Sequence, residues 1–156
     1  MFVIIALVCI AADQISKAYI ESRMNFNRFT VIPKILDIAH VRNTGAAFGM
    51  LKGRTGLLTV VTCLMILALT VYVFVNKKNL SKLEIASIAL ICGGGVGNLI
   101  SRLRFGYVTD FIDIHILPVF NLADICITCG CALLVVAVLI SDFAKQGIKP
   151  PGEIDV

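Results

Sequence analysis

Two aspartates are the side chains in this sequence best suited to catalysis. Asp110 follows Val108 and Thr109, and Asp124 lies fourteen residues further on, at the start of a long apolar run. If the chain turns back between them, the carboxylates meet, and one retains a proton because adjacent carboxylates cannot both ionise easily. Such a pair supplies a base that deprotonates water and an acid that protonates a departing amide nitrogen. The spacing alone also allows a structural interpretation, in which Asp124 caps a helix and Asp110 occupies a turn.

Two further polar pairs interrupt apolar segments at helical spacing. Asp13 and Lys17 are four residues apart, as are Asn98 and Arg102, so the members of each pair share one face of a helix. Asp13 and Lys17 could form an ion pair at membrane depth or extend separately to the membrane surface, and the sequence leaves both arrangements open. Asn98 and Arg102 present an amide and a guanidinium together, which suits the backbone or a carboxylate of a bound peptide.

A run of glycines, Gly93-Gly94-Gly95-Val96-Gly97, immediately precedes Asn98. It matches neither a nucleotide-binding P-loop nor a dinucleotide-binding turn, so we interpret it as a site of close contact between membrane helices. Cys126 and Cys129 have the spacing of metal ligands, but no second ligand pair lies outside the apolar segments. We therefore expect no metal site.

The elements that must position these residues are membrane helices. Hydrophobic residues make up 58% of the 156-residue chain and charged residues only 15%, against about 25% in an ordinary soluble domain. A chain of this length cannot bury so much apolar surface by itself, so lipid must form part of its solvent. The 14 Lys and Arg are spread along the chain without a basic block, which argues against a nucleic-acid partner.

Four stretches are long and apolar enough to cross a bilayer core, which needs about 20 residues of helix. They cover residues 1–20, 55–76, 83–103 and 123–141. The polar segments after the first and third stretches are rich in β-branched residues, which predicts short strands. We therefore predict one all-α membrane domain with four transmembrane helices, a small β platform at one membrane surface, which the resemblance described below makes extracytoplasmic, and a disordered tail over about 145–156.

The first apolar stretch also resembles a cleaved leader. A signal peptide, however, has a basic residue before its apolar run, and this chain has none there. With four spans, both termini share one side of the membrane and the β platform lies on the other. Eight Lys and Arg fall on the platform side and five on the side of the termini. The positive-inside rule alone therefore places the termini outside, although the contrast is weak.

Five motifs, in order along most of the chain, resemble those of the bacterial lipoprotein signal peptidases, the type II signal peptidases. The matching segments are Asp13-Gln14-Ile15-Ser16-Lys17, Arg42-Asn43-Thr44-Gly45-Ala46-Ala47-Phe48-Gly49, Gly93-Gly94 with Gly97-Asn98-Leu99-Ile100, Val108-Thr109-Asp110-Phe111, and Phe120-Asn121-Leu122-Ala123-Asp124. Each motif is weak by itself, whereas five in order beside four predicted spans are specific.

The resemblance implies an intramembrane aspartyl endopeptidase that removes the signal peptide from a prolipoprotein, cutting just before a cysteine that carries a diacylglyceryl group. It implies that Asp110 and Asp124 form a catalytic dyad that needs no cofactor. The positions implied to bind the peptide and support the dyad are Asp13, Lys17, Asn43, Gly94, Asn98, Arg102, Asn121 and Ala123. The implied partners are lipid-modified prolipoprotein signal peptides and membrane lipid. We expect a monomer, although the sequence leaves the oligomeric state open.

The resemblance also implies a location in the bacterial cytoplasmic (inner) membrane. The active site would lie at the outer face and both termini in the cytoplasm, contrary to the charge count. The rival class of function is a small carrier or channel subunit that uses its charged residues as an ion path. Such a protein needs polar residues along several helices at mid-depth, whereas the second and fourth apolar stretches offer only a few hydroxyl groups.

The chain departs from the family pattern at Ser101, where the family has an acid beside the arginine that matches Arg102. If that acid only holds Arg102, serine weakens the function, and if it supports the dyad directly, this chain is slow or inactive. On a helix, Ser101 would project near the same face as Asn98. An aspartate at position 101 would place a negative charge beside the guanidinium of Arg102 and orient it better than a hydroxyl group can. We therefore expect Ser101→Asp to raise the cleavage rate or the thermal stability.

Overall fold

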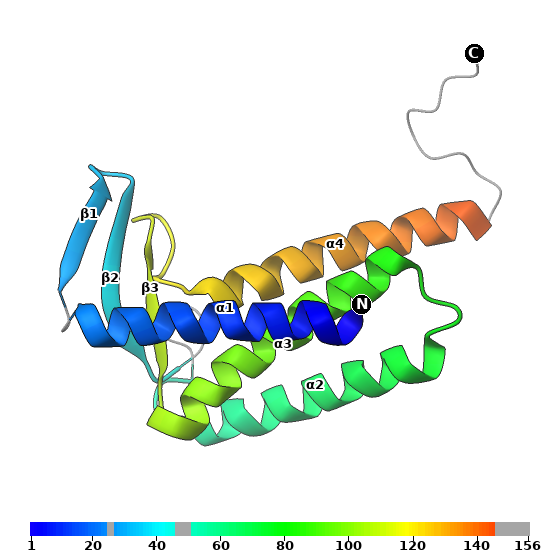
Figure 1. The fold of residues 1–156 in the computed structure, drawn as a ribbon, viewed down its shortest axis with the longest axis horizontal. Helices are drawn as coiled ribbons and strands as arrows, with labels where there is room; N and C mark the ends of the chain where they lie inside the picture. Colours follow the sequence, from blue (N-terminus) through cyan, green and yellow to red (C-terminus); the bar gives the residue numbers. More distant parts are fainter. Residues whose placement is uncertain (25–26, 46–50, 146–156) are drawn as a thin grey trace, which may run out of the picture.

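The computed structural model describes residues 1–24, 27–45 and 51–145. The predicted tail beyond residue 145 and the motif residues 46–49 lie outside the described residues. The elements follow the order α1 (Phe2–Arg23), β1 (Arg28–Ile32), β2 (Leu36–Asn43), α2 (Thr55–Asn76), α3 (Lys82–Phe105), β3 (Val108–Asp113) and α4 (Leu122–Lys145) (Figure 1). In the described residues, four helices are long and apolar enough to cross a membrane. The predicted fold class is confirmed.

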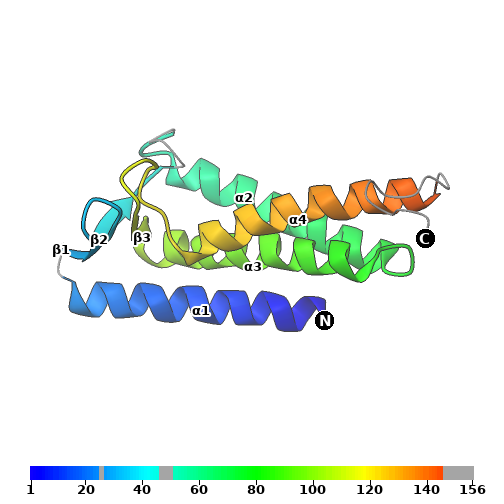
Figure 2. The same ribbon diagram turned by 90° about the horizontal axis from the view of Figure 1, so that it is seen from above.

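Helix α3 is the centre of the bundle, with α1 on one side of it and α2 on the other (Figure 2). Ser81 and Glu84 form a capping box at its start, and Gly106 ends it in a left-handed conformation with φ of 75°. The glycines of α3 allow α1, α4 and α2 to pack closely against it. A Cβ on Gly93 would collide with α1, one on Gly94 with α4, and one on Gly95 would press against α2. The interpretation of this run as a helix-contact site is confirmed.

The other three helices turn most of their apolar side chains outward. In α2 only Val73 is buried, although the helix contains no charged residue. This is the expected burial of a helix whose outer faces contact lipid chains rather than water. α1 packs against α3 and α4 as an integral part of the bundle, which disagrees with the alternative interpretation as a cleaved leader.

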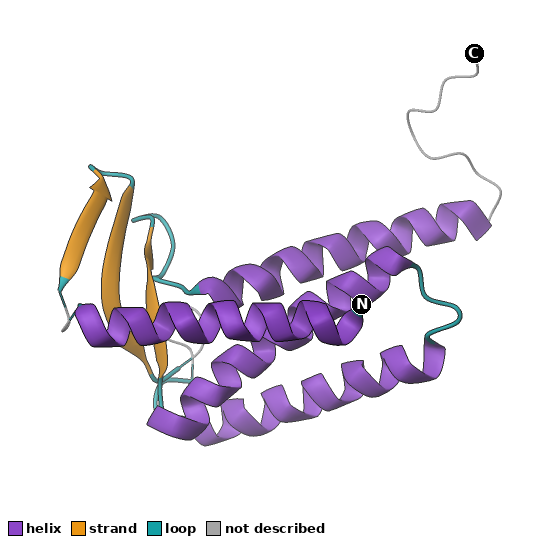
Figure 3. Ribbon diagram, viewed as in Figure 1, coloured by secondary structure: helices purple, strands orange, loops and turns teal. Residues whose placement is uncertain are grey.

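A three-stranded antiparallel sheet lies at one end of the bundle, in the order β1-β2-β3 (Figure 3). β1 and β2 form a hairpin, and β3 adds to it from the segment after α3, pairing Asp110 with Val41 and Asp113 with Asp37. Beyond β3 the chain returns and Phe120 pairs with Ile112 before α4 begins. The first residue and the α2–α3 connection lie at the opposite end of the bundle from the sheet (Figure 1).

Candidate active site

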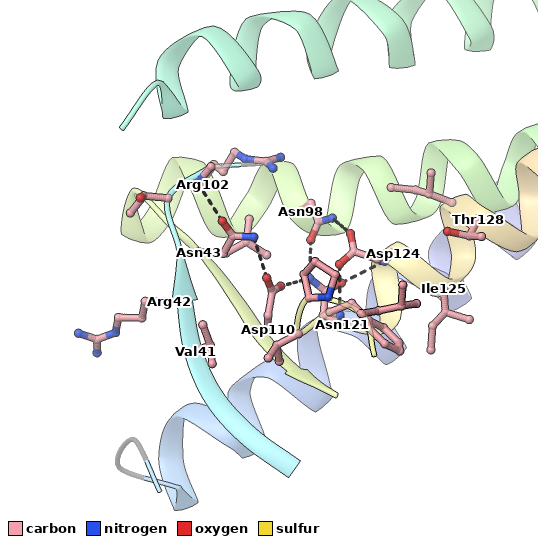
Figure 4. Close-up of a pocket in the computed structure, with 18 of the residues that line it drawn as sticks. Val41, Arg42, Asn43, Asn98, Arg102, Asp110, Asn121, Asp124, Ile125 and Thr128 are labelled. Atoms are coloured by element: carbon pink, nitrogen blue, oxygen red, sulfur yellow. Dashed lines mark hydrogen bonds between the residues drawn. The ribbon is translucent and has the colours of Figure 1, made fainter. Parts of the chain in front are cut away.

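Asp110 lies in β3, with its side chain directed into the protein (Figure 4). Only 2% of the residue is exposed. Its Oδ1 accepts a hydrogen bond of 2.6 Å from Nδ2 of Asn121, and its Oδ2 accepts one of 2.8 Å from Nδ2 of Asn43. Burial raises the pKa of Asp110 to about 6, although the two amide donors favour the ionised form. This carboxyl group therefore exchanges its proton near neutral pH. Asp110 lies in a strand, whereas the structural interpretation of the sequence places it in a turn.

Asp124 lies in the first turn of α4, directly after the return of the chain from the sheet. Its Oδ2 accepts the backbone N–H of Asn121 at 3.2 Å, and Oδ1 of Asn121 accepts the backbone N–H of Asp124 at 3.1 Å. The two residues thus cap the helix reciprocally, as the structural interpretation requires. The other oxygen, Oδ1 of Asp124, accepts a 2.8 Å bond from Nδ2 of Asn98. Capping and a place in the site are therefore compatible.

One amide side chain connects the two aspartates. Nδ2 of Asn121 donates to Asp110 and also to Oδ1 of Asn98 at 3.2 Å, while Asn98 in turn donates to Asp124. Because Asn121 is held at the start of α4, the strand carboxylate and the helix carboxylate are brought to one place by a short chain of hydrogen bonds (Figure 4).

The Asp13–Lys17 pair supports this network from α1. Nζ of Lys17 lies 2.8 Å from Oδ2 of Asp13 and 2.8 Å from Oδ1 of Asn98. Asp13 is 0% exposed and Lys17 is 4% exposed, so they form a buried ion pair, and the alternative of two separate surface charges is wrong. Oδ1 of Asp13 also accepts the backbone N–H of Ala123 at 3.0 Å, which attaches α1 to the first turn of α4.

A cavity of about 730 Å³ contains both aspartates. Asn43, Asn98, Arg102 and Asn121 line it beside the two aspartates, together with an apolar face of α4 that includes Ile125 and Ile127. The other predicted site residues, Asp13, Lys17, Gly94 and Ala123, are not among its lining residues. They hold the helices and side chains that carry the cavity wall. Within the described residues, Nε of Arg102 is buried and has no hydrogen-bond partner.

Two polar contributors are absent from the predicted site. Nε2 of Gln14 donates to Oδ2 of Asp13 and to the backbone oxygen of Gly97, both at 3.0 Å. Thr109, the neighbour of Asp110, donates a 2.6 Å hydrogen bond to Oε1 of Glu21 in α1. The sequence offers only a weak signal for these contacts, since Gln14 lies beside Asp13, Glu21 lies one turn after Lys17, and Thr109 precedes Asp110.

Ser101, three residues after Asn98 on α3, contributes to a second cavity rather than to the one that holds the aspartates. It is 2% exposed and lines a second cavity of about 360 Å³ together with Lys17 and Arg104. Its hydroxyl group donates to the backbone oxygen of Gly97 at 3.4 Å. Three residues of helix bring a side chain to within about 60° of its starting direction, so Ser101 lies near the face that carries Asn98 but closer to the α1 residues of the second cavity. Ser101 is therefore not a lining residue of the cavity that holds the aspartates.

The described residues contain no group of three or more His, Cys, Asp or Glu side chains arranged to hold a metal ion. The site therefore offers the chemistry of two carboxyl groups, each accepting hydrogen bonds from asparagine residues. Both face a cavity that is part polar and part apolar.

Known proteins are similar to this chain over most of its length. Residues 5–140 match the family model described as signal peptidase (SPase) II. The lipoprotein signal peptidase of Moorella thermoacetica is 41% identical over 153 residues, which cover 96% of this chain and 99% of that protein. The lipoprotein signal peptidase of Staphylococcus aureus is 37% identical over 142 residues, covering 88% of this chain and 86% of the relative.

Two solved structures, each described as a bacterial membrane enzyme studied by the in meso method, share the fold. One matches with a TM-score of 0.84 at 33% identity, and the match covers 99% of this chain and 94% of the solved chain. The other has a TM-score of 0.79 at 35% identity and covers 88% and 92%. Since the family model, the relatives and the structures all match over most of the chain, this multi-pass membrane protein is a protease that belongs to the signal peptidase II family.

Proposed function

We propose that this protease removes the signal peptide from diacylglyceryl-modified prolipoproteins, cutting just before the lipidated cysteine, with Asp110 and Asp124 as an aspartic dyad. The names of the relatives support the class of substrate. The observation that carries the aspartic mechanism is that both carboxylates face one cavity and are connected through Asn121.

The dyad works with one shared proton. Asp110, whose pKa is raised by burial to about 6, carries the proton, and Asp124 acts as the base. Water attacks the carbonyl carbon of the scissile amide, Asp124 takes a proton from that water, and Asp110 gives its proton to the carbonyl oxygen. When the tetrahedral intermediate collapses, the proton on Asp124 moves to the departing nitrogen and the hydroxyl proton returns to Asp110. Neither residue is consumed.

The rest of the cavity binds and orients the peptide. Arg102 offers a guanidinium whose Nε lacks a partner within the described residues, and a substrate carbonyl oxygen can accept from it. The apolar face of α4, with Ile125 and Ile127, accepts apolar parts of the substrate. Asn43 and Asn98 already donate to the dyad and hold its orientation.

The test of the dyad is cleavage of a purified diacylated prolipoprotein, followed by gel shift. Asp110→Asn and Asp124→Asn should each abolish cleavage while the protein still inserts and folds, because a neutral amide can be neither base nor acid. Asp142→Asn, the same change at an exposed position on α4, should leave the rate unchanged. Substantial turnover by either dyad variant would show that the dyad is wrongly assigned.

We propose further that the protein lies in the cytoplasmic membrane with the sheet end at the outer face and both termini in the cytoplasm. Thr30 in the β1–β2 hairpin and Asn79 in the α2–α3 connection are both exposed, at opposite ends of the bundle. Single cysteines at these positions in a cysteine-free background should react with an impermeant reagent from opposite sides, position 30 from outside. Outside labelling at position 79 would favour the orientation that the charge count gives.

A further inference from the structure

Four charged or titratable side chains gather on the sheet, outside the cavity that holds the dyad. We call Arg28, Asp37, Asp113 and His115 the outer-sheet cluster. The NH1 nitrogen of Arg28 lies 2.8 Å from Oδ2 of Asp37 and 2.8 Å from Oδ2 of Asp113. Nε2 of His115 lies 3.3 Å from the same Oδ2 of Asp37. The cluster joins all three strands, and the proposed dyad chemistry does not use it.

The cluster contains two carboxylates placed face to face. Asp37 and Asp113 are direct partners across the β2–β3 ladder, and like charges at such positions destabilise a sheet. Their side chains are only 6% and 10% exposed, so water screens them incompletely. The hydrogen bond from Arg28 holds the pKa of Asp37 below its ordinary value, which keeps that carboxylate ionised. One guanidinium therefore compensates two facing charges, and its loss leaves them opposed.

The cluster also holds the start of a loop that forms one wall of the dyad cavity. His115 has a left-handed backbone with φ of 66°, and its N–H donates to Oδ1 of Asp113 at 2.9 Å. Leu117 and Pro118, which follow it, line the cavity. The loop ends where Phe120 exchanges backbone hydrogen bonds of 2.8 and 3.0 Å with Ile112. The wall loop, residues 114–119, is thus attached at one end by the ladder and at the other by the cluster.

We propose that the outer-sheet cluster positions the wall loop and thereby sets the affinity of the cavity for its substrate. The four residues of the cluster are positioning residues, since they act through Leu117 and Pro118 and do not approach the reacting atoms. This inference rests on the proposed function, because it concerns the substrate of the same cavity. It requires that damage to the cluster raises KM and leaves kcat nearly unchanged.

The test is a double-mutant cycle on the cleavage of a purified diacylated prolipoprotein. Arg28→Gln leaves Asp37 and Asp113 opposed, and we expect KM to rise about tenfold with kcat within about twofold of wild type. Adding Asp113→Asn removes one of the facing charges and should return KM to within about threefold of wild type. Lys34→Gln is the matched control, since Lys34 lies in the same hairpin and makes no ion pair among the described residues.

Amide hydrogen exchange over residues 112–120 gives a second readout that needs no cleavage. Arg28→Gln should speed this exchange by about tenfold, and the double variant should reverse the change. An unchanged KM, an equal loss in kcat, or unchanged exchange would each overturn the inference. Arg28→Lys, whose single ammonium keeps one pairing, should be intermediate and replaces Arg28→Gln if the latter does not fold. A wild-type protein that cleaves no prolipoprotein would instead overturn the proposed function, while the exchange experiment would still test the role of the cluster.

Discussion

The contact between Gly94 and α4 gives a prediction whose size follows from the structure. A Cβ at Gly94 would lie closer to the Ala123 backbone oxygen than van der Waals contact allows, 2.9 Å from Cγ1 of Ile127 and 3.2 Å from Cβ of Cys126, where ordinary contacts measure 3.4–4 Å. The Ala123 oxygen belongs to the helix backbone and cannot rotate away. In Gly94→Ala the two helices must therefore separate by roughly 1 Å, since close-packed helices have no free volume to absorb the methyl group.

That displacement acts on the dyad because Asp124 directly follows Ala123. The bond of 2.8 Å from Asn98 to Asp124 would stretch beyond hydrogen-bonding distance, and the carboxylate would move away from Asp110. A misplacement of about 1 Å costs on the order of 100-fold in rate. We therefore expect kcat of Gly94→Ala to fall about 100-fold, measured by single-turnover cleavage of a diacylated prolipoprotein.

The neighbouring Gly95→Ala is the matched control. It adds the same methyl group to the same helix, but the nearest atoms are Cδ1 and Cγ1 of Ile66, both at 3.2 Å, at the flexible end of a side chain on α2. We expect this variant to keep the wild-type rate within about twofold, because Ile66 can change rotamer. If Gly94→Ala also cleaves at nearly the wild-type rate, the tight α3–α4 contact does not position Asp124, and the reasoning is refuted.

Three other predictions concern the buried charges. Because burial raises the pKa of Asp110 from 3.8 to about 6, the folded protein retains a proton that the unfolded chain releases, so stability should fall as pH rises from about 4 to about 6 and then level off. This change in the free energy of unfolding amounts to roughly 3 kcal/mol, and Asp110→Asn should remove it when thermal unfolding is measured across pH. An unaltered pH dependence would contradict the raised pKa of Asp110. Lys17→Met leaves the fully buried Asp13 carboxylate without its cation and should cost about 3–5 kcal/mol in thermal unfolding, much of which Asp13→Asn restores in the double variant. A double variant no more stable than Lys17→Met would show that the pair is not the cause. Ser101→Asp should raise Tm, because the second cavity offers the new carboxylate two cations, Lys17 and Arg104, against the one carboxylate of Glu21. Lower stability together with slower cleavage from about pH 5 to about pH 8 would show that serine is not a weakened support.

The sequence was enough to predict the helices and the sheet segments and to propose the residues of the site. A span depends on about 20 consecutive residues and a strand on fewer, so local hydropathy and β-branched content predict both. The Asp13–Lys17 pairing is also local, because residues four apart on a helix are neighbours whatever surrounds them. The spacing of Asp110 and Asp124 alone did not distinguish a catalytic pair from a cap and a turn. The order of five short motifs favoured the catalytic pair.

The tertiary structure alone decided which of these residues meet the cavity and which support it. Asp13 reaches the N–H of Ala123 across 110 residues of sequence, and Asn121 connects a strand carboxylate to a helix carboxylate. Ser101 contributes to the second cavity and not to the one that holds the aspartates, although it lies only three residues after Asn98. The outer-sheet cluster depends on the register that brings Asp37 opposite Asp113. Such outcomes depend on the rotation of each helix about its axis and on the register between strands, which long-range packing sets and local spacing does not encode.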